Sequence, residues 1–327
     1  MSANKMVVIS TLADSSQWDV FLKRKPDGWQ ISLINPDEGE EKMARELEDA
    51  QYLVTSNSGT IPANVVHGAK QLKLIQTMGM DVGHLPMKWA LDNGILVANA
   101  GGANAISVAE HTLFLILACL RRLPKLDKSI REGKFRKNVE NWDTGSHQFY
   151  DKTVGIIGFG NIGRRVAKLC HDFGASIIYS ERVFVPYALR ADSKAEPVSL
   201  DELLSKSDIV SLHIPSFLGN RGMIGWNELC KMKPSAYIIN TSRGINIDED
   251  ALVRALNEKK IAGAGIDVWD PEPPSADNSL LKMLNVVATP HGAGTVVENW
   301  QPRCETAWHN LMLVSEDKEP VNRIIEF

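Results

Sequence analysis

Polar side chains suited to anion binding and proton transfer follow four successive apolar segments in the second half of the chain. Short apolar runs of this kind predict buried β-strands. In an open sheet of parallel strands, ligands bind beyond the carboxyl ends of the strands, so we expect these side chains to gather at one edge. The segments are Ile209–His213, which ends in His213; Tyr237–Asn240, followed by Arg243; Gly263–Asp267, which ends in Asp267 and precedes Glu272; and Val286–Thr289, followed by His291.

Three of these residues have the chemistry that reduction of a 2-oxo acid requires. Arg243 can bind a carboxylate through its planar guanidinium group and polarise the adjacent ketone. His291 can donate a proton to the forming alkoxide, or accept it in the reverse reaction. Glu272 can hydrogen-bond His291 and favour the imidazolium, which would raise the pKa of His291 into the working range.

Each residue also has an ordinary structural explanation. An arginine after a strand is commonly solvated or ion-paired, and a histidine after a proline, such as His291, is commonly a turn residue. Glu272 lies between two prolines, as exposed loop residues do. His213 is the residue most readily explained as structural, and Asp267 could cap a turn or a helix. Their joint position at one predicted sheet edge is what favours a site.

The hydride would come from a dinucleotide, whose site is predicted at Val154–Gly163, VGIIGFGNIG. Here an apolar strand is followed by Gly158, Gly160 and Gly163 in the order G-x-G-x-x-G. The first glycine permits a tight turn, the second lets a diphosphate approach the backbone, and the third allows close packing of helix on strand. The helical segment Arg164–Cys170 follows, and the helix amino terminus favours the phosphate charge.

A second strand, Ser176–Tyr179, leads to Glu181, at the distance where an acidic residue holds the hydroxyls of the adenosine ribose. Such a carboxylate would repel a 2′-phosphate, whereas the neighbouring Arg182 could bind one. The cofactor is therefore predicted to be NAD or NADP, with a slight preference for NAD.

These segments must be positioned by a larger fold, and the rest of the chain alternates strand and helix patterns. That alternation predicts an α/β protein with parallel sheets, and 327 residues are enough for two domains. Further strands are expected at Met6–Ser10, Gln30–Ile34, Tyr52–Thr55, Leu72–Gln76 and Ile95–Ala98. Helices are expected at Glu40–Ala50, Met87–Asn93, Leu200–Ser205, Trp226–Lys231, Glu249–Lys259 and Val297–Val314.

Composition argues against several other classes of protein. The chain is 44% hydrophobic and carries a formal charge of -4, so nothing basic indicates a nucleic-acid partner. Its four cysteines are scattered, which indicates reduced thiols and no metal site. Met1–Ser10 lacks the apolar core of a signal peptide. We therefore expect a cytoplasmic protein without a membrane partner.

The most apolar stretch, Ile106–Leu120, is too short to span a bilayer. Ser107 and Glu110 form an S-x-x-E pattern, which predicts a capping box at the start of a helix. A helix that is apolar nearly all round must be buried in a core or in a subunit interface.

Taken together, the motifs resemble the D-isomer-specific 2-hydroxyacid dehydrogenase family along nearly the whole chain. The resemblance implies two doubly wound parallel-sheet domains, with a Rossmann cofactor domain at 104–295 inserted into a flavodoxin-like substrate domain made of 1–103 and 296–327. It also implies a homodimer formed through residues 104–121. The matching segments are Val154–Gly163, His213–Pro215, Met232–Pro234, Ile239–Gly244, Ala262–Pro273 and Asn285–His291.

The resemblance also implies the roles of individual residues. Arg243, Glu272 and His291 correspond to the catalytic set, and Asp267 to the residue that meets the nicotinamide carboxamide. Substrate binding falls on Arg243, His291 and the loop Met78, Gly79, Met80 and Asp81. Cofactor binding falls on Gly158, Phe159, Gly160, Asn161, Ile162, Gly163, Glu181, Arg182, His213, Pro215, Thr241, Ser242, Arg243, Asp267 and His291.

Departures from the family pattern narrow the substrate. Glu272 stands where the formate branch has a glutamine, and Met78 stands where the phosphite branch has a lysine. The loop after His213 reads Pro215–Leu218, PSFL, instead of the usual Pro-Leu-Thr. A small 2-oxo acid such as glyoxylate or hydroxypyruvate, or a larger analogue, remains as the expected substrate. The alternative is an NAD(H)-sensing corepressor of the same fold, which would bind the cofactor without turnover.

Overall fold

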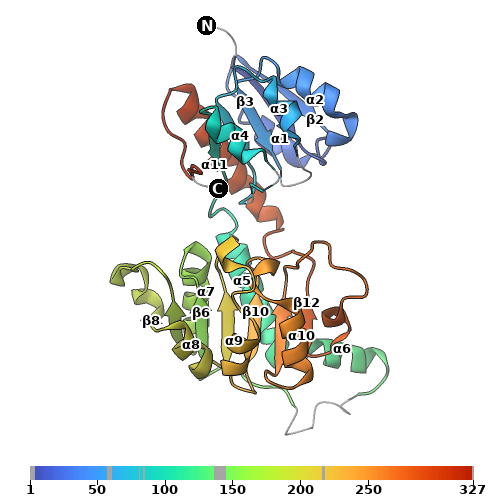
Figure 1. Cartoon of the computed structure of the whole chain (residues 1–327), viewed down its shortest axis with the longest axis vertical. Helices are drawn as coiled ribbons and strands as arrows, with labels where there is room; N and C mark the ends of the chain where they lie inside the picture. The colour runs from blue at the N-terminus through green and yellow to red at the C-terminus, as the bar shows by residue number, and fades with distance from the viewer. Residues whose placement is uncertain are drawn as a thin grey trace. The chain divides into compact units, whose positions relative to one another are not determined.

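The computed structural model describes residues 4–56, 61–80, 82–83, 85–135, 145–215 and 218–325. The chain divides into two compact units, one formed by Met1–Ala103 with Val297–Phe327 and the other by Asn104–Val296. Each unit has its own parallel sheet with helices on both faces (Figure 1). Among the described residues, no helix is long and apolar enough to cross a membrane.

The first unit contains a five-stranded parallel sheet in the order β2-β1-β3-β4-β5, which is the flavodoxin-like order. Successive residues of a strand face opposite sides of the sheet. Val7 and Ile9 therefore pack under α2, α3 and α4, while Met6 and Val8 pack under α1 and α11. The elements are β1 Asn4–Ile9, α1 Gln17–Leu22, β2 Trp29–Ile34, η1 Pro36–Glu38, α2 Glu40–Leu47, β3 Tyr52–Thr55, α3 Ala63–His67, β4 Leu74–Thr77, α4 Met87–Asp92, β5 Leu96–Ala98, η7 Val297–Asn299 and α11 Trp300–Ser315.

The carboxyl-terminal helix α11 completes this unit. Trp308 stacks on Phe21 of α1, with ring centroids 4.8 Å apart, and its indole N–H donates to the Phe21 carbonyl at 2.7 Å. Cys304, Ala307 and Leu311 of α11 are fully buried against the same face of the sheet. Segments from both ends of the chain therefore share one hydrophobic core.

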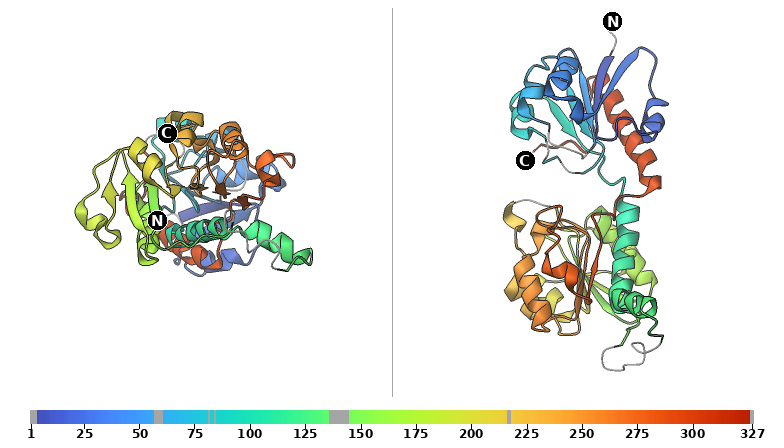
Figure 2. Two further views of the ribbon diagram at one scale, coloured as in Figure 1. Left: turned by 90° about the horizontal axis from the view of Figure 1, so that it is seen from below. Right: turned by 90° about the vertical axis from the view of Figure 1, so that its right-hand side faces the viewer.

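The second unit contains a seven-stranded parallel sheet in the order β12-β11-β10-β9-β6-β7-β8. Helices α5 and α7 cover one face and α8, α9 and α10 the other (Figures 1 and 2). The elements are α5 Ala105–Leu120, α6 Leu123–Arg131, β6 Thr153–Ile157, α7 Asn161–Asp172, β7 Ser176–Ser180, η2 Tyr187–Leu189, η3 Ala191–Ser193, β8 Glu196–Pro197, α8 Leu200–Lys206, β9 Ile209–Leu212, η4 Leu218–Asn220, α9 Trp226–Lys231, β10 Tyr237–Asn240, η5 Gly244–Asn246, α10 Glu249–Asn257, β11 Gly263–Ile266, η6 Ser279–Lys282 and β12 Val286–Ala288.

Strand order reverses between β6 and β9, the neighbouring strands at the centre of this sheet. From β6 the chain runs outward through β7 and β8, and then returns to β9 and continues in the other direction. In doubly wound folds, ligands bind at the carboxyl ends of the strands at such a reversal point. The predicted fold class, two doubly wound parallel-sheet domains, is confirmed.

Helix α5 packs against α7 and across β10, β11 and β12. It starts at Ala105, two residues before the predicted cap, so the predicted capping box is wrong. The Ser107 hydroxyl lies inside the first turn and donates to the Asn104 carbonyl at 3.0 Å. Most of the helix is buried, but Ile106 and Phe114 are 58% and 45% exposed.

Candidate active site

The glycine-rich turn after β6 has two glycines that the fold requires and one that it leaves open. Gly158 has φ +90°, and a Cβ there would lie 2.7 Å from the His213 carbonyl oxygen. A Cβ on Gly163 would lie 2.1 Å from the Gly158 carbonyl oxygen, so only glycine lets α7 pack this closely. Gly160 precedes α7, and a Cβ there would meet no atom within 4 Å. That open space above a helix amino terminus fits the diphosphate of a dinucleotide.

Glu181 follows β7 and is held by the same turn. Its carboxylate accepts hydrogen bonds from the backbone N–H of Phe159 at 2.8 Å and of Arg182 at 2.7 Å. The buried Phe159 ring stacks on Tyr179 at 4.1 Å between centroids. Glu181 and Arg182 also line one surface pocket together with Arg190 and the loop between them. The predicted adenosine-binding residues therefore lie around one hollow beside the glycine turn.

His291 and Glu272 are in direct contact. The distance between Nδ1 of His291 and Oε2 of Glu272 is 2.8 Å, and the other carboxylate oxygen accepts from the Trp269 N–H at 2.9 Å. This hydrogen bond to Glu272 raises the pKa of His291 above its ordinary value, although desolvation opposes the shift. Desolvation alone would raise the pKa of Glu272, but the hydrogen bonds from His291 and Trp269 outweigh it and lower that pKa.

Arg243 lies on the neighbouring loop, after β10. Its guanidinium donates to the Ser242 carbonyl at 2.7 Å, and its charge acts on both Glu272 and His291. The loops after β10 and β11 touch at Gly244, where a Cβ would lie 2.0 Å from the Trp269 carbonyl oxygen. This close backbone contact brings the guanidinium and the carboxylate–imidazole pair to one edge of the sheet.

His213 does not share this arrangement. Its ring turns back toward its own strand and contacts the Ser211 hydroxyl at 2.8 Å. Burial lowers the pKa of His213 to about 3, so the ring is neutral. The ring therefore has a structural partner, while the backbone carbonyl of His213 lies against Gly158.

Asparagines that carried no signal in the sequence tie the surrounding loops together. Asn220 donates to the Pro215 carbonyl at 2.9 Å and accepts from Arg182 at 3.1 Å. Asn246 donates to the Ile214 carbonyl at 3.1 Å and to the Ser242 hydroxyl at 3.0 Å. Ser216 and Phe217, in the loop that departs from the family pattern, lie outside the described residues.

Two other predicted cofactor residues also have partners within the protein. The Thr241 hydroxyl contacts that of Thr112 on α5 at 2.9 Å, and Ser242 donates to Asn240 through its N–H and its hydroxyl. Asn161 and Ile162 form the first turn of α7. These contacts order the loop after β10 and the start of α7 at the same edge of the sheet.

The predicted substrate loop lies in the first unit, directly after β4. Met78 is buried in the hydrophobic core, and its N–H donates to the Thr55 carbonyl at 2.8 Å. Met80 is 44% exposed, and Asp81 lies outside the described residues. The Met78 side chain is therefore a core residue here, and contact with a substrate remains a prediction for Gly79 and Met80.

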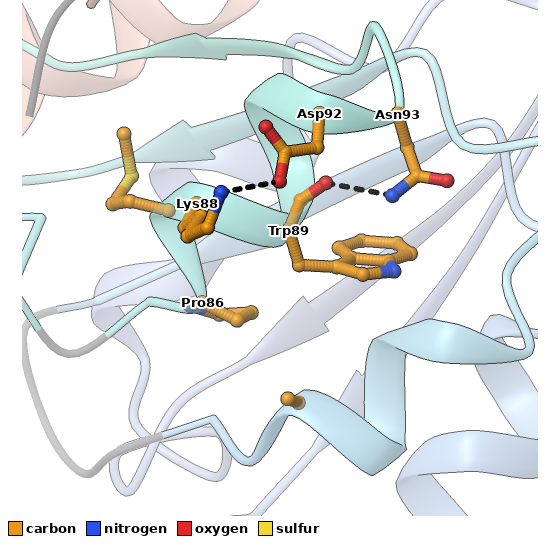
Figure 3. Close-up of a pocket in the computed structure, with 7 residues that line it drawn as sticks. Pro86, Lys88, Trp89, Asp92 and Asn93 are labelled. Atoms are coloured by element: carbon orange, nitrogen blue, oxygen red, sulfur yellow. Dashed lines mark hydrogen bonds and ion pairs between the residues drawn. The ribbon is translucent and has the colours of Figure 1, made fainter.

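The first unit also has an apolar hollow at α4 (Figure 3). Its polar groups are paired with each other: Lys88 with Asp92 at 2.8 Å, and the Asn93 amide with the Trp89 carbonyl at 2.8 Å. It contains none of the predicted catalytic residues. Among the described residues, no group of three His, Cys, Asp or Glu side chains is arranged to hold a metal ion.

A seven-stranded doubly wound sheet with a glycine turn at its switch point defines a dinucleotide-binding class of protein. Residues 113–293 match the family model described as D-isomer specific 2-hydroxyacid dehydrogenase, NAD binding domain. The chain belongs to this family of NAD-dependent oxidoreductases, which act on small 2-hydroxy and 2-oxo acids. The family, enzyme class and NAD cofactor expected from the sequence are confirmed.

Proteins similar to this chain are named for several different substrates. Hydroxypyruvate reductase of Thermotoga maritima is 37% identical over 258 residues, which cover 78% of this chain and 82% of that protein. D-3-phosphoglycerate dehydrogenase of Archaeoglobus fulgidus is 36% identical over 258 residues, which cover 79% of this chain but only 48% of that protein. A glyoxylate reductase from Paecilomyes thermophila superposes with a TM-score of 0.85 at 28% identity and covers 99% of both chains.

Proposed function

We propose that this enzyme interconverts a small 2-oxo acid and the corresponding D-2-hydroxy acid, with Arg243 binding the carboxylate and His291 with Glu272 moving the proton. The contact of 2.8 Å between His291 and Glu272 is the observation that carries this proposal. The hydroxypyruvate and glyoxylate reductases among the similar proteins favour substrates of two or three carbons. Bound NADH supplies the hydride to the ketone carbon.

The hydrogen bonds of Glu272 determine which imidazole nitrogen can react. An ionised carboxylate only accepts hydrogen bonds, so Nδ1 of His291 must carry a proton and Nε2 is left to face the substrate. In reduction, the imidazolium gives its Nε2 proton to the carbonyl oxygen as the hydride reaches carbon, and a neutral imidazole with Nδ1–H remains. In oxidation, the same neutral nitrogen accepts the hydroxyl proton. The raised pKa of His291 favours the form that donates.

Arg243 has a different task. Its guanidinium presents two parallel N–H groups to a carboxylate, a geometry that fixes the orientation of the adjacent ketone. The contact at 2.7 Å to the Ser242 carbonyl uses Nη1 and anchors the side chain. The positive charge beside His291 also disfavours a second cation there, so it helps the imidazolium to release its proton to the substrate.

Substitution of His291 tests this function. We expect His291→Ala to lower the turnover of glyoxylate or hydroxypyruvate by about 10²- to 10⁴-fold, the usual share of general acid–base catalysis. NADH binding, followed by fluorescence titration, should persist because the glycine turn is untouched. Wild-type turnover in this variant would contradict the assignment. Wild-type protein that binds NADH but turns over no 2-oxo acid in a broad panel would favour the corepressor alternative.

We also propose that the enzyme is a homodimer formed through residues 104–121. Ile106 and Phe114 are the support, because they expose large apolar side chains on a helix that is otherwise mostly buried. Phe114→Asp should convert the dimer to a monomer in light scattering, whereas substitution of the exposed Phe173, on the same unit, should not. A monomeric wild type would contradict this proposal. A cytoplasmic location is proposed from the four free cysteines, of which three are buried.

A further inference from the structure

The loop that carries His291 is wrapped around one buried carboxylate. Asp267 is fully buried at the end of β11 and receives the N–H groups of three successive residues. His291 donates to the Asp267 backbone carbonyl at 2.7 Å, Gly292 to Oδ1 at 2.9 Å and Ala293 to Oδ2 at 2.9 Å. The backbone position of His291 therefore depends on the orientation of Asp267.

This loop needs an anchor because His291 has a left-handed backbone conformation, with φ +54°. A residue with a side chain is disfavoured there, and surrounding contacts must stabilise it. The three N–H groups bound to Asp267 provide those contacts. Any rotation of the Asp267 carboxylate would loosen two of them and let the imidazole move.

The Asp267 carboxylate is also held by two successive hydrogen bonds, one from Thr289 and one from His111 to Thr289. The Thr289 hydroxyl donates to Oδ1 of Asp267 at 2.5 Å, and Nε2 of His111 lies 3.1 Å from the same hydroxyl. A carboxylate only accepts, so the single hydroxyl proton of Thr289 points to Asp267. The hydroxyl must then accept from His111, and Nε2 of His111 must carry a proton. The direction of the chain is determined: His111 to Thr289 to Asp267.

His111 comes from α5, on the face of the sheet that this helix covers, and its ring rests against Phe114 at 5.5 Å between centroids. Its Nε2 is also 3.6 Å from Oδ1 of Asp267. The polar tip of a side chain on an apolar helix is therefore directed at the buried carboxylate. Neither the acid–base step nor the predicted cofactor contacts assign a task to His111 or Thr289.

We propose that His111 and Thr289 are positioning residues of this enzyme, which act through Asp267 on the loop that places the His291 imidazole. The inference rests on the proposed role of His291. Because α5 is also the proposed subunit interface, the same chain would link that interface to the proton-transferring group. Removal of either hydrogen bond should displace the imidazole while the glycine turn after β6 stays intact.

Paired substitutions at Thr289 and His111 test this directly. Thr289→Val keeps the shape and removes the hydroxyl, whereas Thr289→Ser keeps the hydroxyl. His111→Leu removes the donor, whereas His111→Gln can keep an N–H at the position of Nε2. We expect Thr289→Val and His111→Leu each to lower kcat by about 10- to 100-fold, because a small misplacement of a reacting group has an effect of this size. Thr289→Ser and His111→Gln should restore most of it, and the Kd for NADH, to which the untouched glycine turn contributes, should change less than kcat does.

A matched control separates positioning from general loss of stability. Ser207 is fully buried, whereas Thr289 is half-buried, and the Ser207 hydroxyl donates to the Leu203 carbonyl just before β9 begins, at the amino ends of the strands. Ser207→Ala should lower Tm by as much as Thr289→Val does, without lowering kcat. Equal kcat for Thr289→Val and wild type, or an equal loss of kcat in Ser207→Ala, would overturn the proposal.

The Thr289→Val substitution made together with His291→Ala tests the positioning role separately from the proposed function of His291. If Thr289 acts through His291, then Thr289→Val should change kcat by no more than about twofold once His291 is alanine. If the fold-losses in kcat of the two single variants multiply in the double variant, Thr289 does not act through His291. That result would overturn the positioning role alone. Wild-type turnover in the single variant His291→Ala would instead overturn the proposed function on which it rests.

Discussion

Alanine substitutions at the second and third glycines of the turn after β6 should separate cofactor binding from folding. At Gly160 the backbone has φ −75°, which alanine adopts freely, and a Cβ meets no protein atom within 4 Å. The gain from a stiffer unfolded chain offsets the weaker helix cap, so we expect Tm to change by no more than about 2 °C. The new methyl group would occupy the space of the diphosphate. The expected Kd for NADH is about 10- to 100-fold weaker.

Gly163→Ala should do the reverse. Its Cβ would lie 2.1 Å from a backbone oxygen, so α7 must move away from β6 by about 1 Å to restore normal contact. Overpacking of this kind costs about 1–3 kcal/mol, which corresponds to a fall in Tm of about 2–12 °C for a unit of this size. Calorimetry and NADH titration on both variants provide the assay. An unchanged Kd for Gly160→Ala would refute the placement of the diphosphate over this turn, and an unchanged Tm for Gly163→Ala would refute the packing argument.

Further predictions concern the charged residues. Glu272→Gln removes the carboxylate that raises the pKa of His291, so the loss of reductase activity at alkaline pH should begin at lower pH than in wild type; an unshifted profile of kcat/KM would show that Glu272 does not control that proton. Arg243→Lys should lower kcat/KM for the 2-oxo acid by about 10- to 100-fold, since an ammonium group cannot replace the paired N–H groups, and equal kinetics would make Arg243 a structural residue. Glu181→Ala should weaken NADH and improve NADPH, while Arg182→Ala should weaken NADPH more than NADH. Unchanged ratios of the two cofactors in both variants would place the specificity elsewhere in the pocket.

Burial explains why the strands could be predicted from the sequence. Tyr52–Thr55 and Tyr237–Asn240 have the predicted bounds, because a parallel strand covered on both faces is a continuous apolar run. The two-residue edge strand β8 ends in Pro197 and has no such run, so it was not predicted. Helix α1 is only six residues long and was not predicted either.

The residues of the candidate site also fall into those that could be predicted from the sequence and those that could not. Polar residues directly after strands, such as Arg243 and His291, could be located because the sheet itself defines where they lie. The asparagines that cross between loops, Asn220 and Asn246, belong to no periodic pattern and follow only from the folded geometry. A role for His111 could not be predicted for another reason. It lies in a helix whose apolar composition indicates only that the helix packs in a core or an interface.

The return of α11 to the first unit has a consequence for synthesis of the protein. On the ribosome, Asn104–Val296 emerges before the residues that complete the first unit, so the second unit can fold while the first is still unfinished. Until α11 arrives, Trp18 and Phe21 of α1 and the sheet face beneath them lack the α11 side chains that bury them. The first unit is thus the last to reach its native packing, and until then part of its apolar core is exposed to wrong contacts.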